Sequence, residues 1–122
     1  MNNAFTSVEQ TLIQSTTVTA DKNLSYSTSP GNNTIDKIFL LSIPEVTKYF
    51  TTDSARYCTP TAYAKAQGAY TRSNNCWWWL RTPGSSSYYA SYVYTDGSIL
   101  YFGDLVHNER DAVRPAMWIN LG

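Results

Sequence analysis

The sequence predicts a single α+β domain, with short helices in its first half and a small antiparallel sheet in its second half. Two capping boxes, each a Ser or Thr followed three positions later by Glu, mark helix starts early in the chain. Later, runs of Trp and Tyr surround an Asp-Gly dipeptide, which is a good hairpin signal. A length of 122 residues fits one domain, and no repeat or linker divides it, so we treat residues 1–122 as one unit.

Local signals at both ends place the helices. The capping boxes predict a helix over residues 6–14 and a second over residues 42–50. A third helix is expected over Pro60–Gln67, where Thr59 caps the start and Gly68 closes the end.

The predicted strands are short runs of apolar and aromatic residues. The turn Thr95–Ser98 contains the Asp-Gly pair and joins two of them as a hairpin. The stretch Ser15–Asn33 is rich in Ser, Thr and Asn, so we expect a long surface loop there. Strands are expected at Lys37–Leu41, Trp77–Leu80, Tyr89–Tyr94, Ile99–Phe102 and Val113–Ile119.

Four consecutive bulky residues divide between the two faces of their strand. Alternation places Trp77 and Trp79 on one face, and Trp78 and Leu80 on the other. Because Trp buries a large area and needs a partner for its N–H, we expect at least two of these Trp residues to pack in the core.

Arg81 and Arg114 lie near prolines, one before and one after the Tyr-rich part of the chain. Arginine is rarely buried unless it is paired. We therefore expect guanidinium groups that bond loop carbonyls and hold the base of the segment between them. Anion recognition is the alternative.

The charge balance and the lack of a long apolar run exclude two classes of partner. Nine basic residues balance nine acidic ones, so the chain lacks the positive field that nucleic acid binding requires. No apolar run approaches the roughly 20 residues that cross a bilayer, so we predict no membrane insertion. Met1 is followed by Asn2-Asn3 rather than by a basic and then an apolar stretch, so any export signal is expected outside this chain.

Tyrosine is concentrated in one part of the chain. Half of the ten Tyr residues fall between Tyr88 and Tyr101, separated by Ser. Tyr with Ser, Gly and Asn is the mixture found in antibody paratopes, although Tyr is also common in ordinary sheets. We expect some of Tyr88, Tyr92 and Tyr94 to share one face, with Tyr101 across the hairpin.

Residues capable of metal or redox chemistry are few. Cys58, Cys76 and His107 do not make a four-ligand zinc site, and Asp96-Gly97 alone is a weak calcium signal. We predict no metal, no cofactor and no catalytic residue, since no nucleophile motif accompanies His107. The two cysteines either form a disulfide in an exported protein or are small buried residues.

Several motifs together resemble a family. Asp36–Ile43, Pro60–Ala66, Trp78–Gly84 and Val113–Ile119 look like a bacterial and phage domain family in which "WWLRSPG" precedes "YVxxDGS" and "VRPALWI" ends the domain. That family resembles the C-type-lectin-like fold of the formylglycine-generating-enzyme type. The resemblance implies that fold for residues 1–122, with short helices first and a small antiparallel sheet last.

The same resemblance extends to the variable proteins of diversity-generating retroelements, in which adenine-directed mutagenesis randomises a C-terminal segment. It implies a variable ligand-binding segment at residues 85–111. The residue types there are reachable from an Asn codon by changes at adenines, with Glu109 as the exception. The predicted ligand-binding residues are Ser85, Ser86, Ser87, Tyr88, Tyr89, Ser91, Tyr92, Tyr94, Leu100, Tyr101, Phe102, Asp104, Leu105, His107, Asn108, Arg110 and Asp111.

The sequence thus favours a non-catalytic, receptor-like or adhesin-like module that binds a protein or a glycan. We expect it at a cell surface, in the extracellular space or on a virion, as part of a larger protein. Two alternatives stay open: an oxidoreductase of the formylglycine-generating type that uses Cys58 and Cys76, and a structural assembly unit. The relatives carry an extra helix segment before Ala4-Phe5-Thr6. The chain is therefore expected to be a trimmed fragment, or a short form that completes its core as a homo-oligomer.

Overall fold

Short helices and short strands share the chain in the computed structural model, which describes residues 5–121. The predicted α+β class is confirmed, while the expectation about the start of the chain before Phe5 falls outside these residues. The helices are α1 (Ser7–Leu12), α2 (Ile43–Tyr49), the 3-10 helix η1 (Ser54–Arg56) and α3 (Ala62–Ala66). The strands are β1 (Thr16–Val18), β2 (Thr34–Asp36), β3 (Thr71–Arg72), β4 (Asn75–Cys76), β5 (Trp78–Pro83), β6 (Tyr89–Val93) and β7 (Ile99–Leu105).

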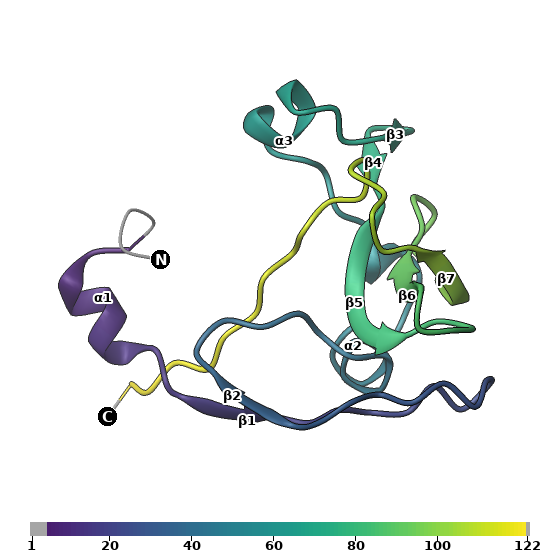
Figure 1. The fold of residues 1–122 in the computed structure, drawn as a ribbon. Coiled ribbons are helices and arrows are strands. Elements are labelled where there is room, and N and C mark those ends of the chain that lie inside the picture. Colours follow the sequence, from purple (N-terminus) through teal and green to yellow (C-terminus); the bar gives the residue numbers. More distant parts are fainter. Residues whose placement is uncertain (1–4, 122) are drawn as a thin grey trace.

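Figure 1 shows how these elements lie in space. The sheet of β5, β6 and β7 lies at one end of the molecule, and α1 lies at the other. The C-terminal segment runs between the two ends and pairs with the start of the chain, where Ile13 forms a bridge with Ile119.

Side-chain caps fix where the first two helices begin. The Thr6 hydroxyl accepts from the Glu9 N–H at 3.1 Å, and the Glu9 carboxylate accepts from the Thr6 N–H at 2.8 Å. Ser42 and Glu45 make the same reciprocal pair at 3.3 and 2.9 Å at the start of α2. Both predicted capping boxes are confirmed, since each satisfies two backbone donors that the helix leaves free.

The third helix begins later than predicted. Its cap is Thr61 rather than Thr59, and the Thr61 hydroxyl accepts from the Ala64 N–H at 3.1 Å. Pro60 therefore lies before the cap instead of opening the helix. Gly68 follows the helix with a φ of +94°, a conformation that favours glycine, so the predicted closing residue is correct.

Two predicted strands, Lys37–Leu41 and Val113–Ile119, do not form. They touch at one point, where Phe39 and Ala116 exchange backbone hydrogen bonds of 3.0 and 2.7 Å. The carbonyl groups at the end of the first run bond Arg81 instead, which takes them out of any further ladder. Apolar composition was a correct signal of packing here and a wrong signal of strand pairing.

The stretch Ser15–Asn33, expected to be a loop throughout, contains β1. This strand pairs with β2 in an antiparallel ladder, with Thr16 opposite Asp36. Thr and Val favour such pairing, and the rest of the stretch is the connection between the two strands.

The three-stranded sheet has two distinct faces. Its order is β5-β6-β7, with antiparallel neighbours; Trp78 lies opposite Val93 and Trp79 opposite Tyr92. Tyr92 in turn lies opposite Leu100. Because successive side chains alternate, the predicted division of the Trp residues is confirmed. We call the side of Trp78 and Val93 the inner face, and the side of Trp79, Tyr92 and Leu100 the outer face.

The inner face builds the core. Trp78, Leu80 and Val93 pack with Ile43 and Val46 of α2. The Trp78 side chain is fully buried, and its indole N–H donates at 3.0 Å to a backbone carbonyl of η1. The side chains of the inner face therefore form the hydrophobic core and stabilise the fold.

Arg81 and Arg114 make different kinds of contact. Arg81 donates to the carbonyls of Thr19 at 3.0 Å and Leu40 at 2.8 Å and pairs with Glu45, as predicted for a structural guanidinium. Arg114 instead lies over two aromatic rings of the core, at 4.8 and 4.9 Å from their centres. One of its nitrogens has no hydrogen-bond partner among residues 5–121, so the carbonyl contacts expected of it are not observed.

The predicted hairpin turn at Thr95–Ser98 is present, and β7 continues beyond the predicted end at Phe102. Gly97 adopts a φ of +81°, and a Cβ there would lie only 1.9 Å from the Asp53 carbonyl oxygen. Its own carbonyl accepts from the Arg56 guanidinium at 2.7 Å. The turn is thus tied to the loop that follows α2.

Thr82 links this sheet to α2 and provides a test of the packing. Its buried hydroxyl accepts from the Ile43 N–H at 2.9 Å. Thr82→Val keeps the shape and leaves that donor unpaired, so the free energy of unfolding should fall by about 1 to 3 kcal/mol in urea denaturation. The exposed Thr17→Val change is the control and should alter it by less than about 0.5 kcal/mol. Equal effects would show that the bond to Ile43 contributes nothing.

Candidate functional site

Five aromatic rings gather at the outer face. Trp77 lies at the centre: its ring is 5.0 Å from that of Tyr92, 5.2 Å from Tyr70 and 5.3 Å from Tyr94, between ring centres. Trp79 meets Tyr92 edge to face at 6.3 Å. We call these residues the aromatic cluster. All but Tyr92 keep part of their surface open to solvent, so the cluster can contact another molecule.

Polar groups without partners lie beside the aromatic cluster. The Trp77 indole N–H is buried and has no hydrogen-bond acceptor among the described residues. Both carboxylate oxygens of Asp111 are likewise buried and without a donor from that part of the chain, and the residue is only 8% exposed. Most buried polar groups in proteins have partners, so these three atoms need an explanation.

Asp104 and Asp111 place negative charge beside Tyr92, and the Arg72 guanidinium donates to the Tyr94 hydroxyl at 3.4 Å. Burial raises the pKa of Asp111 to about 7, and the nearby charge of Asp104 adds to the effect. The pKa of Tyr92 rises to about 12, because of burial first and then because of Asp104 and Asp111. These causes place both carboxyl groups near the Tyr92 hydroxyl.

The segment after β7 brings Asp111 to this place. At the start of this segment, the Val106 N–H donates to the Tyr88 carbonyl at 3.0 Å, where β7 ends next to the beginning of β6. Its end joins the free edge of β5, where Ala112 exchanges bonds with Trp77 at 2.9 Å and Trp79 at 3.1 Å. Residues 106–111 therefore cross from one edge of the sheet to the other.

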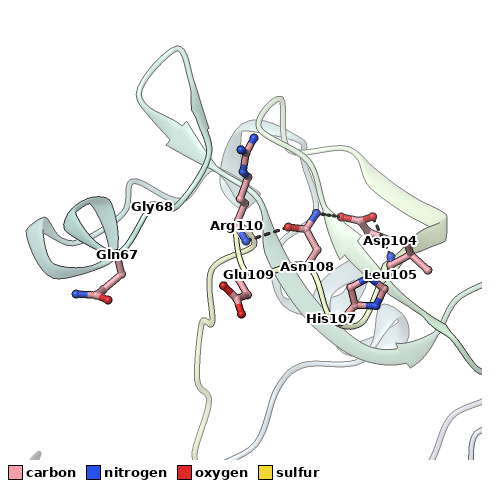
Figure 2. Close-up of a pocket in the computed structure, with 8 residues that line it drawn as sticks. All are labelled: Gln67, Gly68, Asp104, Leu105, His107, Asn108, Glu109 and Arg110. Atoms are coloured by element: carbon pink, nitrogen blue, oxygen red, sulfur yellow. Dashed lines mark hydrogen bonds between the residues drawn. The ribbon is translucent and has the colours of Figure 1, made fainter.

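An open depression of about 540 Å³ borders this crossing segment. Figure 2 shows that the end of α3 forms one side and the crossing segment the other. Asn108 organises the second side, because its amide donates to the Asp104 carboxylate at 2.6 Å and its oxygen accepts from the Arg110 N–H at 2.9 Å. The lining residues are Gln67, Gly68, Asp104, Leu105, His107, Asn108, Glu109 and Arg110.

The structure brings together about half of the predicted binding residues. Those at the outer face or the depression are Tyr92, Tyr94, Leu100, Asp104, Leu105, His107, Asn108, Arg110 and Asp111. They come from three parts of the chain that the hairpin and the crossing segment unite.

The other predicted residues point elsewhere. Ser91 is fully buried and donates to the Thr82 carbonyl at 2.7 Å. Tyr101 lines a cavity beside α2 rather than joining Tyr92, because Leu100 takes the position across the hairpin. Tyr89 and Phe102 pack on each other with ring centres 5.2 Å apart. Ser85, Ser86 and Ser87 line a depression along residues 26–29, and Tyr88 projects into solvent.

Sequence reasoning placed Trp77 and Trp79 with the structural framework and did not single out Tyr70. The alternation of the Trp residues was the available signal, since it puts two of them opposite the core. Tyr70 precedes the β3–β4 hairpin, and nothing local to it indicates that its ring meets Trp77.

Cys58, Cys76 and His107 are the remaining groups that the sequence singled out for redox, metal or acid–base chemistry. The Cys76 thiol donates to the Cys58 carbonyl at 3.1 Å, and burial raises the pKa of Cys76 to about 12, which disfavours the thiolate. His107 is exposed on the crossing segment. Within residues 5–121, no three His, Cys, Asp or Glu side chains group as a metal site, and no helix is long and apolar enough to span a membrane.

Comparison with known proteins identifies one relationship. A family model described as a domain of unknown function (DUF6273) matches residues 1–121. No curated protein and no solved structure matches the chain.

Asp111 predicts an unusual dependence of stability on pH. Because its folded-state pKa is raised above the ordinary 3.8, the stabilisation from its proton is complete below about pH 4 and is lost as the pH rises through about 7. Asp111→Asn does not titrate. It should therefore raise the free energy of unfolding by about 2 to 3 kcal/mol more at about pH 8 than at about pH 5.

Urea denaturation at the two pH values measures this difference. Asp36→Asn, at an exposed position in β2, is the control and should show a difference below about 0.5 kcal/mol. If Asp111→Asn behaves like that control, the carboxyl group is not held in the buried, unpartnered state described above.

Proposed function

The chain belongs to the DUF6273 family, and we propose that it is a non-catalytic module that binds a ligand at its outer face. The observation that carries this proposal is the aromatic cluster with its unpartnered indole N–H and carboxylate oxygens. Large rigid rings give contact area at low entropic cost, and unpartnered polar atoms can be satisfied by a ligand. The binding would be a matter of contacts alone, without bond chemistry.

The separation of the two faces supports this proposal. The core uses the inner face, so side chains on the outer face and the crossing segment can change without removing packing contacts of Trp78 or Val93. Most of the predicted binding residues are exposed or half-buried, and the buried ones are Ser91, Tyr92 and Asp111. Such a surface can be adapted to a ligand while the scaffold stays fixed.

We also propose that the domain has the C-type-lectin-like fold and that residues 85–111 are diversified by a retroelement. The small antiparallel sheet, the short helices and the paired ends of the chain support the fold proposal. The adenine-reachable residue types and their exposure support the diversification proposal. A protein or a glycan, presented at a cell surface or virion, would be the ligand.

Two exposed tyrosines test the proposed surface. Tyr70 belongs to the aromatic cluster and is 38% exposed, whereas Tyr63 on α3 lies outside it and is 76% exposed. For a ligand selected from glycan and protein arrays, Tyr70→Ser should weaken binding by about tenfold or more, because aromatic anchors dominate interface energies. Tyr63→Ser should change it by less than about twofold.

Surface plasmon resonance measures both affinities, and circular dichroism confirms that both variants fold. Equal losses, or a loss confined to Tyr63→Ser, would place the binding surface elsewhere. Arrays that yield no ligand for the folded chain would count against the binding function itself.

A further inference from the structure

From the unpartnered atoms at the outer face we infer that the site receives an arginine side chain of a protein ligand, with its guanidinium on Asp111 and its flat face on the aromatic cluster. This inference rests on the proposed binding function and names the chemistry of the ligand. Three features of the site carry it: the number and type of free hydrogen-bonding atoms, the local charge and the shape of the neighbouring rings.

The free atoms define what a ligand must supply. Asp111 presents two buried carboxylate oxygens, which need two donors, and Trp77 presents one buried N–H, which needs an acceptor. A guanidinium offers paired N–H donors in the geometry of a carboxylate. The peptide carbonyl beside an arginine side chain offers the acceptor. An arginine within a peptide therefore matches all three atoms.

The local charge favours a cation over a neutral group. The segment from Asp104 to Asp111 contains three acidic residues and one arginine in a chain whose formal net charge is zero. Asp104 acts on Asp111 and its effect is repulsive, whereas the Arg72 guanidinium bonds the Tyr94 hydroxyl rather than Asp111. A bound cation would remove that repulsion and compensate the cost of burying the carboxylate, which a neutral sugar hydroxyl cannot do.

The shape of the site favours guanidinium over a compact ammonium group. Trp77 and Tyr92 are nearly parallel, with 27° between their planes, and Trp77 keeps part of its surface exposed. Planar guanidinium groups stack on such rings, whereas an ammonium is a strongly hydrated point charge. The depression lined by Asp104 borders the same crossing segment that carries Asp111.

Two small probes of equal shape test the inference with the whole chain. N-acetyl-arginine methylamide carries the guanidinium, and N-acetyl-citrulline methylamide replaces it with a neutral urea. In nuclear magnetic resonance titrations at about pH 8, the arginine probe should bind saturably and shift the indole N–H signal of Trp77. We expect the citrulline probe to bind about tenfold more weakly or worse.

Variants then locate the receiving group. Asp111→Asn should weaken binding of the arginine probe by about tenfold or more, and the matched change Asp36→Asn, at an exposed residue of β2, by less than about twofold. If Asp111→Asn fails to fold, Asp104→Asn serves as a second variant. It should weaken binding of the arginine probe by an intermediate amount.

Each opposing result overturns the inference. Absence of binding up to about 10 mM, equal binding of the two probes, or equal loss in Asp111→Asn and Asp36→Asn would exclude a guanidinium site at Asp111. Binding of methyl glucoside in place of the arginine probe would also exclude it, while leaving the proposed binding function intact. The proposed binding function is tested separately, by the ligand arrays and by the Tyr70 and Tyr63 variants.

Discussion

The register of β5 against β6 is the constraint on which the rest of the structure depends. With Trp78 opposite Val93, every second residue of β5 enters the core, and Trp77 and Trp79 must lie on the other side. A shift of one residue would exchange the two sets. The same pairing thus sets the hydrophobic core and the aromatic cluster, so the fold and the candidate site are consequences of one alignment.

The sequence correctly predicted those features of the fold that depend on interactions between residues close together in the chain. The capping boxes of Thr6 and Ser42, the turn around Gly97 and the alternation of the Trp residues were all correct, because each depends on neighbours within a few positions. The strand expected at Lys37–Leu41 was wrong because its backbone partners lie far away in the chain, at Arg81 and Ala116. Sequence pattern does not contain that information.

The candidate site divides in the same way. The segment containing Tyr92, Asp104 and Asp111 was predicted from composition and resemblance, but their meeting point depends on the crossing of residues 106–111 over the sheet. Tyr101 lies away from the outer face, because the hairpin places Leu100 opposite Tyr92. The site therefore required the three-dimensional register, and the unpartnered Asp111 carboxylate could be recognised only there. Its burial without a hydrogen-bond donor among residues 5–121 costs stability.

We propose that a fixed scaffold presents a surface that is free to change, and sequencing the same locus with its flanking DNA from several isolates can test this. We expect substitutions to concentrate at adenines of the codons for exposed residues in Ser85–Asp111, beside a reverse-transcriptase gene and a template repeat, while Trp78, Leu80 and Val93 stay constant. A segment as constant as those core residues would contradict it, and a fixed ligand or an assembly role would then explain the outer face.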